Sequence, residues 1–301
     1  MSEIRFDGRV AVVTGAGGGL GRAYALLLAS RGAKVVVNDL GGSFDGTGSD
    51  STPAQQVVDE IKANGGEAVA NYESVAEWES AQKIIQTAID SYGKLDILIN
   101  NAGILRDKSM LKMEDEDYKK VMAVHMDGTF YCTKAALPYM RENNYGRIVG
   151  TASAAGVYGN FGQTNYGAAK MGIFGLMRSV KQEGAKYNIL ANTIVPVAGT
   201  RLTATVMPPD VIENLKPEFV APMVAWMCSD ECEVSGQLFS AGGGYFSRIA
   251  VIEGQGVMFD LDKEFTVDDV SANIGEIMNV EGGTEFESVT EQTTKVLSRF
   301  M

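Results

Sequence analysis

Residues 9–21, RVAVVTGAGGGLG, decide the fold, because a short apolar run leads there directly into a glycine-rich turn. The β-branched residues of 9–15 predict a buried strand. Residues 20–31, LGRAYALLLASR, have the composition of a helix that stops at Gly32. The stretch therefore predicts one unit made of a strand, a tight turn and a helix.

The same alternation of strand and helix continues along the chain. Further strands are predicted at 34–39, 67–72, 94–103, 147–153 and 189–196, with the last strand at 236–243. Helices are predicted near 54–63, 77–91, 115–141 and 165–187. Because strands that alternate strictly with helices pair in parallel through right-handed crossovers, we expect an α/β fold with a doubly wound parallel sheet of the Rossmann type.

Two segments depart from this alternation. Residues 40–53, LGGSFDGTGSDSTP, form a long loop after the second strand, and loops of that length are usually functional or mobile. In the tail, Thr266 and Asp269 have the spacing of a capping box. Apolar residues then recur at helical spacing at Val267, Val270, Ile274 and Ile277, and again at Val289, Val296, Leu297 and Phe300. We therefore expect a dinucleotide-binding domain at 1–245 and a helical C-terminal extension at 246–301.

Composition and charge exclude several classes of protein. A formal net charge of -12 argues against a general nucleic-acid binder, which needs a basic surface. No apolar run reaches the ~18–20 residues that cross a bilayer, and residues 1–13 lack the features of a secretory signal. With a single histidine, His125, we expect no metal site. The cysteines, Cys132, Cys228 and Cys232, include no C-x-x-C pair and indicate packed thiols in a reducing compartment.

The glycine-rich turn has the pattern of a dinucleotide site. Gly15, Gly19 and Gly21, with Leu20 between the last two, allow a tight turn, close approach to a pyrophosphate, and close packing of helix on sheet. The helix N-terminus directs its unpaired N–H groups and its dipole at the phosphates. Asp39, which closes the second strand, can accept hydrogen bonds from both adenosine ribose hydroxyls and would repel the extra phosphate of NADP. The sequence therefore favours NAD as the cofactor.

A second constellation lies later in the chain, in NYGAAK at 165–170. Tyr166 and Lys170 are four residues apart on a predicted helix and share one face. A nearby ammonium and an oxidised nicotinamide would favour phenolate, so Tyr166 could act as a general base. Ser153, at the end of a predicted strand, could stabilise the reacting oxygen, although a serine there can also cap a turn.

Together these motifs resemble the short-chain dehydrogenase/reductase family. The resemblance rests on T-G-x-x-x-G-x-G at 14–21, N-N-A-G at 100–103, Ser153, and Y-x-x-x-K at 166–170. A narrower resemblance is to the (3R)-hydroxyacyl-CoA dehydrogenase units of peroxisomal multifunctional enzymes of type 2. It rests on NDLGGSF, NNAGILRDKSM, GVYGNFGQTNYGAAK, AGTRLTATVMP and the tail, and it extends over nearly the whole chain.

The family resemblance implies further roles. Lys170 would also hydrogen-bond the nicotinamide ribose. Asn101 would support either the adenosine side of the cofactor or the central sheet. Further cofactor contacts are implied at Ser74, Val75, Ala198, Gly199 and Thr200. His125 stands where many members have an asparagine that anchors a proton relay, so it is either part of that relay or a packed core histidine.

The resulting hypothesis is an NAD-dependent oxidation of (3R)-3-hydroxyacyl-CoA to 3-oxoacyl-CoA in fatty-acid β-oxidation. One alternative is a short-chain dehydrogenase acting on a steroid or an acyl-carrier-protein substrate. The other is an NAD-binding protein without catalysis, which would have no need of Ser153, Tyr166 and Lys170 together. The tail and the resemblance predict a homodimer, and the resemblance also implies a possible fusion to a hydratase. It implies a peroxisomal location too, although residues 299–301 do not match an S-K-L signal, and the cytoplasm is the alternative.

Overall fold

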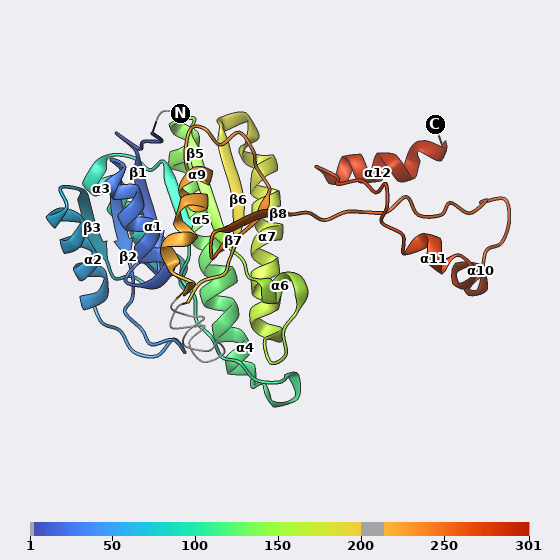
Figure 1. Cartoon of the computed structure of the whole chain (residues 1–301), viewed down its shortest axis with the longest axis horizontal. Helices are drawn as coiled ribbons and strands as arrows, with labels where there is room; N and C mark the ends of the chain where they lie inside the picture. The colour runs from blue at the N-terminus through green and yellow to red at the C-terminus, as the bar shows by residue number, and fades with distance from the viewer. Residues whose placement is uncertain (1–2, 200–213, 301) are drawn as a thin grey trace. The chain divides into compact units, whose positions relative to one another are not determined.

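The computed structural model describes residues 3–199 and 214–300. Within them, eight strands form one sheet in the order β3-β2-β1-β4-β5-β6-β7-β8 (Figure 1). The strands are β1 (Val10–Thr14), β2 (Lys34–Asn38), β3 (Glu67–Asn71), β4 (Ile97–Asn100), β5 (Gly146–Thr151), β6 (Ile189–Pro196), β7 (Leu238–Gly242) and β8 (Tyr245–Ile249). All neighbours from β3 to β7 pair in parallel, so the predicted fold class is confirmed.

The helices connect these strands and are numbered as in Figure 1. They are α1 (Gly19–Ser30), α2 (Thr52–Ala63), α3 (Trp78–Tyr92), α4 (Asp115–Met122), α5 (Gly128–Glu142), α6 (Ala154–Tyr158), α7 (Thr164–Gly184) and α9 (Ala221–Met227). Short 3-10 turns lie at Met110–Lys112, Ala185–Tyr187 and Pro217–Phe219. The single helix that we predicted near 115–141 is interrupted by a π-helical turn at Ala123–Asp127. Such turns often occur at functional sites, and this one contains His125.

The sheet is covered by helices on both faces. Alternate residues of one strand point to opposite faces, so Val13 belongs to the core shared with α1, α2 and α9, and Val12 to the core shared with α3, α5 and α7. Strands buried on both sides are apolar throughout, which explains why VAVV and VVV lack a polar face.

The strand order places a ligand site. β1 pairs with β2 on one side and with β4 on the other, so the chain direction across the sheet reverses at β1. In doubly wound sheets, ligands bind beyond the carboxyl ends of the strands at this reversal. The glycine turn after β1 and the segment after β4 both lie there.

In the described part of the chain, the sheet contains one strand more than the sequence predicts. We expected the last strand at 236–243, but the chain reverses after β7 and adds β8. Gly243 and Gly244 have φ of 56° and 80°, which suits a two-residue type I′ hairpin turn. Because two residues cannot make a parallel crossover, β8 is the antiparallel edge of the sheet.

The chain divides into two compact units, Met1–Arg248 and Ile249–Met301. The second contains α10 (Val267–Ala272), α11 (Ile274–Ile277), α12 (Val289–Leu297) and a last 3-10 turn at Ser298–Phe300. The predicted capping box is present, because Thr266 and Asp269 bond reciprocally at the start of α10. The first predicted tail helix is divided in two at Asn273. Among the described residues, no helix is long and apolar enough to cross a membrane.

Candidate active site

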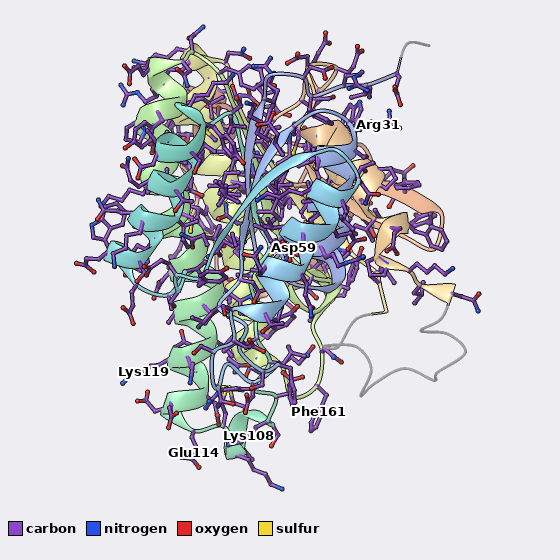
Figure 2. The ribbon with its side chains drawn as sticks, turned by 90° about the vertical axis from the view of Figure 1, so that its left-hand side faces the viewer. Arg31, Asp59, Lys108, Glu114, Lys119 and Phe161 are labelled. Carbon is purple, nitrogen blue, oxygen red and sulfur yellow. The ribbon has the colours of Figure 1, made fainter. Side chains whose placement is uncertain are left out.

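A cavity of about 450 Å³ opens at the carboxyl end of the sheet. Segments from both halves of the sheet line it, including the glycine turn, the ends of β2, β4 and β5, and the start of α7. Figure 2 shows this end of the molecule, where the labelled Lys108 and Phe161 lie far from Arg31 at the other end of α1. The cavity therefore lies where the strand order predicts it.

Backbone contacts shape the turn at the cofactor end of this cavity. Gly15 has a φ of +63°, which disfavours any side chain. A Cβ on Gly21 would collide with the Gly15 carbonyl and come within 2.6 Å of Asn101 Nδ2. The Asn101 amide donates to the carbonyls of Thr14 and Gly15, both at 3.0 Å. Asn101 thus joins the segment after β4 to the glycine turn, and it also lines the cavity.

Asp39 lies directly beyond β2 and lines the cavity. Its carboxylate accepts N–H groups of Gly17 and Gly41, each at 2.7 Å, and these bonds fix its orientation. A carboxylate has about four acceptor positions, so two remain for hydroxyl groups of a ligand.

Part of the long loop that follows β2, residues 42–46, forms a wall of the cavity, and we call this segment the strap. Gly42, Ser43, Phe44 and Gly46 line the cavity. The strap is held from the other side of the site, because Leu105 N–H donates to the Phe44 carbonyl at 2.9 Å and Arg106 Nε donates to the Asp45 carbonyl at 3.0 Å. Its length marked this loop as functional or mobile, but no pattern in the sequence indicated where it would be fastened.

Tyr166 and Lys170 meet at the other end of the cavity. Lys170 Nζ lies 5.5 Å from the centre of the Tyr166 ring and donates to the Thr151 carbonyl at 2.7 Å. Burial lowers the pKa of Lys170 to about 7. We expected Lys170 and an oxidised nicotinamide together to lower the pKa of Tyr166; in the protein alone, burial raises that pKa to about 12. The charge of Asp107 raises this pKa further, so among the protein's own groups burial and charge both disfavour phenolate.

Ser153 caps a turn, which is one of the two roles considered for it, and it also contacts the tyrosine. Its hydroxyl accepts the Ala155 N–H at 3.2 Å and caps α6. A hydrogen bond between Ser153 and the Tyr166 side chain also acts to lower the pKa of Tyr166, although it does not overcome burial. One hydroxyl thus connects a helix cap to the tyrosine.

His125 is buried in the π-helical turn, 1% exposed. Its Nε2 lies 3.0 Å from the Ile104 nitrogen and 2.8 Å from the Ile104 oxygen, and its ring lies edge-on to Tyr166 with centroids 5.2 Å apart. A Cβ on Gly103 would collide with the imidazole, so glycine is required there. Nδ1 has no partner among the described residues. Burial and the charge of Lys170 lower the pKa of His125, which keeps the imidazole neutral.

The remaining predicted residues separate into three groups. Gly15, Gly19, Leu20, Ser74, Val75 and Ala198 line the cavity. Gly21 and Gly199 are not among its lining residues. Gly21 packs α1 against the turn, and the Gly199 N–H donates to the Leu215 carbonyl. Thr200 lies outside the described residues.

The cavity suits a dinucleotide on grounds of shape and donor chemistry. Within residues 3–199 and 214–300, no side chain caps the N-terminus of α1, and a Cβ on Gly18 would meet nothing within 4 Å. The helix can therefore offer N–H groups to a diphosphate at close approach. His125 Nδ1 and Thr151 Oγ1 are buried without partners among the described residues, at the end where Lys170 lies.

These features define the class of protein. The family model for short chain dehydrogenases matches residues 9–209. The chain therefore belongs to the short-chain dehydrogenase/reductase family of oxidoreductases, whose members generally use a nicotinamide cofactor.

Within this family, the chain is similar to several individual proteins. Peroxisomal multifunctional enzyme type 2 of Mus musculus is 55% identical over 248 residues, which are 82% of this chain and 33% of that protein. A putative short-chain type dehydrogenase/reductase of Mycobacterium tuberculosis is 52% identical over 274 residues, 91% of this chain and 95% of that one. The structure of full-length peroxisomal multifunctional enzyme type 2 from Drosophila melanogaster matches with a TM-score of 0.83 at 42% identity. That match covers 98% of this chain and 50% of the Drosophila chain.

Proposed function

We propose that this chain catalyses the NAD-dependent oxidation of (3R)-3-hydroxyacyl-CoA to 3-oxoacyl-CoA, a step of fatty-acid β-oxidation. The observation that carries the proposal is one cavity with Asp39 at one end and Ser153, Tyr166 and Lys170 at the other. Similarity to peroxisomal multifunctional enzymes supports the substrate class.

Each end of the cavity has its own part in cofactor binding. Asp39 would hold the adenosine ribose and exclude a 2′-phosphate by charge repulsion, which is the basis for NAD rather than NADP. The N-terminus of α1 would hold the diphosphate, and Lys170 the nicotinamide ribose. When bound, oxidised nicotinamide supplies the hydride acceptor and a positive charge near the tyrosine.

Tyr166 is the general base in this proposal. It would take the hydroxyl proton of the substrate while Ser153 donates a hydrogen bond to the same oxygen. Because burial raises the pKa of Tyr166 to about 12, the positive charges of the occupied site are needed to form phenolate near neutral pH. Oxidation should therefore become faster as pH rises.

Lys170 and His125 would carry the proton away from Tyr166. The pKa of Lys170, about 7, allows its amine to gain or lose a proton near neutrality. The unpartnered Nδ1 of His125 could bind one water molecule that leads the proton onward. His125 would then be a relay residue that also holds Ile104 in place.

The wider setting of the reaction is proposed from the relatives. We place the chain in the peroxisome, acting on acyl-CoA as a homodimer, either alone or joined to a hydratase in a longer protein. The apolar side chains exposed on α10 and α12, such as Val270 and Val296, motivate the dimer because such faces are covered in a stable protein.

The test uses the separated 3R and 3S enantiomers of the substrate. NADH formation is measured with (3R)- and (3S)-3-hydroxyacyl-CoA, and each is repeated with NADP. We expect turnover with the 3R form and NAD. Activity confined to the 3S form, or a preference for NADP, would contradict the proposal, and turnover of steroids alone would favour the alternative substrate class.

A further inference from the structure

Asn165, the residue before the proposed base, is fully buried at the start of α7. Its Oδ1 accepts the Tyr166 N–H at 2.7 Å. That N–H belongs to the first turn of α7, where backbone donors have no partner within the helix. Asn165 thus provides a partner for a half-buried donor that has none within the helix.

The amide nitrogen of Asn165 reaches two other segments. Nδ2 donates to the Arg106 carbonyl at 3.1 Å and to the Asp117 carbonyl at 3.4 Å. Arg106 belongs to the segment after β4, and Asp117 lies in α4, which packs against α7. One carboxamide therefore joins the base to both neighbours by backbone bonds, with every polar atom used.

Arg106 continues this connection toward the cofactor end. Its Nε donates to the Asp45 carbonyl of the strap, and its guanidinium approaches Asp117 at 3.3 Å. A second link, from Gln163 Nε2 to Asp107 Oδ2 at 2.6 Å, joins the same segments but lies at an exposed site. Exposed hydrogen bonds compete with water, so the buried Asn165 is the stronger constraint.

We propose that Asn165 is a positioning residue for the reaction, which fixes the Tyr166 backbone against the segment after β4 and against α4. The inference rests on Tyr166 being the base in the proposed function. Its physical reason is that proton transfer requires heavy atoms within hydrogen-bond reach, and displacements of about 1 Å can cost about 100-fold in rate.

The chain offers a matched control in Asn192 on β6. This asparagine is also buried, 1% exposed, and also bridges backbone groups. Its Nδ2 donates to the Val234 carbonyl at 2.8 Å, and its Oδ1 accepts the Gln237 N–H at 3.0 Å. Asn192 is not among the residues that line the cavity. Loss of either asparagine should therefore destabilise the fold similarly, but only one loss should affect the base.

The experiment compares Asn165→Ala with Asn192→Ala, assayed well below both melting temperatures. We expect both variants to have a lower melting temperature than the wild type. The value of kcat should fall about 10- to 100-fold only in Asn165→Ala. The dissociation constant for NAD should change by less than about threefold in both, because the glycine turn and Asp39 are untouched. Should Asn165→Ala fail to fold, Asn165→Ser is measured under the same criteria.

A second readout does not depend on turnover. In protein labelled at the tyrosine ¹³Cζ, the Tyr166 signal is assigned by its absence from Tyr166→Phe. We expect this signal to shift in Asn165→Ala and to stay in place in Asn192→Ala. An unshifted signal, or equal kcat in the two variants, would overturn the inference. A further outcome is that the wild-type enzyme leaves (3R)-hydroxyacyl-CoA unchanged while the Tyr166 signal still shifts in Asn165→Ala. That pair of results would contradict the proposed substrate but support Asn165 as the residue that positions Tyr166.

Discussion

The two ends of the cavity are built by different means. At the cofactor end, the glycine turn presents backbone groups to the cavity. Hydrogen bonds from Gly17 and Gly41 orient the Asp39 carboxylate, and Asn101 fixes the turn. At the chemical end, Lys170 is a buried side chain and Tyr166 a partly buried one. Both have shifted pKa values, and the Lys170 amine donates to the Thr151 carbonyl.

This difference has a thermodynamic consequence. Backbone groups that find partners contribute to stability, whereas a buried amine is costly because burial disfavours its charged form. The cofactor end can therefore be both stable and functional, while the chemical end is functional at the expense of stability. The predictions below test this contrast.

The largest effect should follow Tyr166→Phe. Removing the hydroxyl removes the proposed base, and general acid–base groups contribute roughly 10²–10⁴-fold. We expect kcat to fall about 10³-fold or more, with the dissociation constant for NAD nearly unchanged. Stopped-flow NADH formation and a fluorescence titration of the cofactor measure the two quantities. Unchanged turnover would remove Tyr166 from the mechanism and revive the non-catalytic alternative.

At the opposite end, Asp39→Asn should change cofactor choice and leave the chemical step intact. The neutral amide no longer repels a 2′-phosphate, so the ratio of kcat/KM for NAD over NADP should fall by about 10- to 100-fold. Asp59→Asn, an exposed site on α2 labelled in Figure 2, is the control for loss of one negative charge. An equal change in both variants would mean that net charge, rather than Asp39, sets the preference.

The same contrast explains what could be predicted from sequence. The cofactor end follows from local spacing, because a glycine turn and a strand-ending carboxylate fix their own geometry. Tyr166 and Lys170 followed from helical spacing, but their shifted pKa values depend on burial by distant segments. The links of Asn165 to residues 106 and 117 are likewise set by packing alone.

Two elements of the fold could not be predicted from the sequence for a similar reason. The Gly243–Gly244 pair is a hairpin signal, yet β8 after it is largely exposed and lacks a clear apolar alternation. The π-helical turn around His125 interrupts a helix whose apolar spacing gives no sign of it. Both depend on contacts with the rest of the structure, which periodicity does not report.

A smaller effect is expected on the free energy of unfolding, and it should differ between alanine substitutions at two glycines of the same turn. Gly21→Ala places a methyl group against the Gly15 carbonyl, and such overpacking costs about 1–3 kcal/mol. A Cβ on Gly18 meets no atom of the described residues within 4 Å. For Gly18→Ala we therefore expect a loss of at most about 1 kcal/mol, from a weaker N-cap. Because Gly18 lines the cavity, its variant should instead bind NAD more weakly. Urea unfolding and cofactor titration test the pair, and equal unfolding free energies would refute the packing argument.

The smallest effect should be a gain in stability at the chemical end, from Lys170→Met. The pKa of Lys170 is about 7 in the folded protein against 10.5 as its ordinary value, so the unfolded chain binds more protons between these two pH values. The cost of burying the charge is therefore complete below pH 7 and disappears as pH rises toward 10.5. Methionine avoids that cost but loses the bond to the Thr151 carbonyl, which leaves a net gain of about 1–2 kcal/mol at pH 6.

This gain should fade by pH 9, while activity is lost at every pH. Urea unfolding at pH 6 and pH 9 measures it, with Lys119→Met as the control, since Lys119 is exposed and paired with Asp115 on α4. A gain that does not depend on pH would show that packing, rather than the buried charge, limits stability at this end. A loss of stability at pH 6 would contradict the proposed difference between the two ends of the cavity. Lys170 would then stabilise the fold, whereas we expect its buried charge to destabilise it.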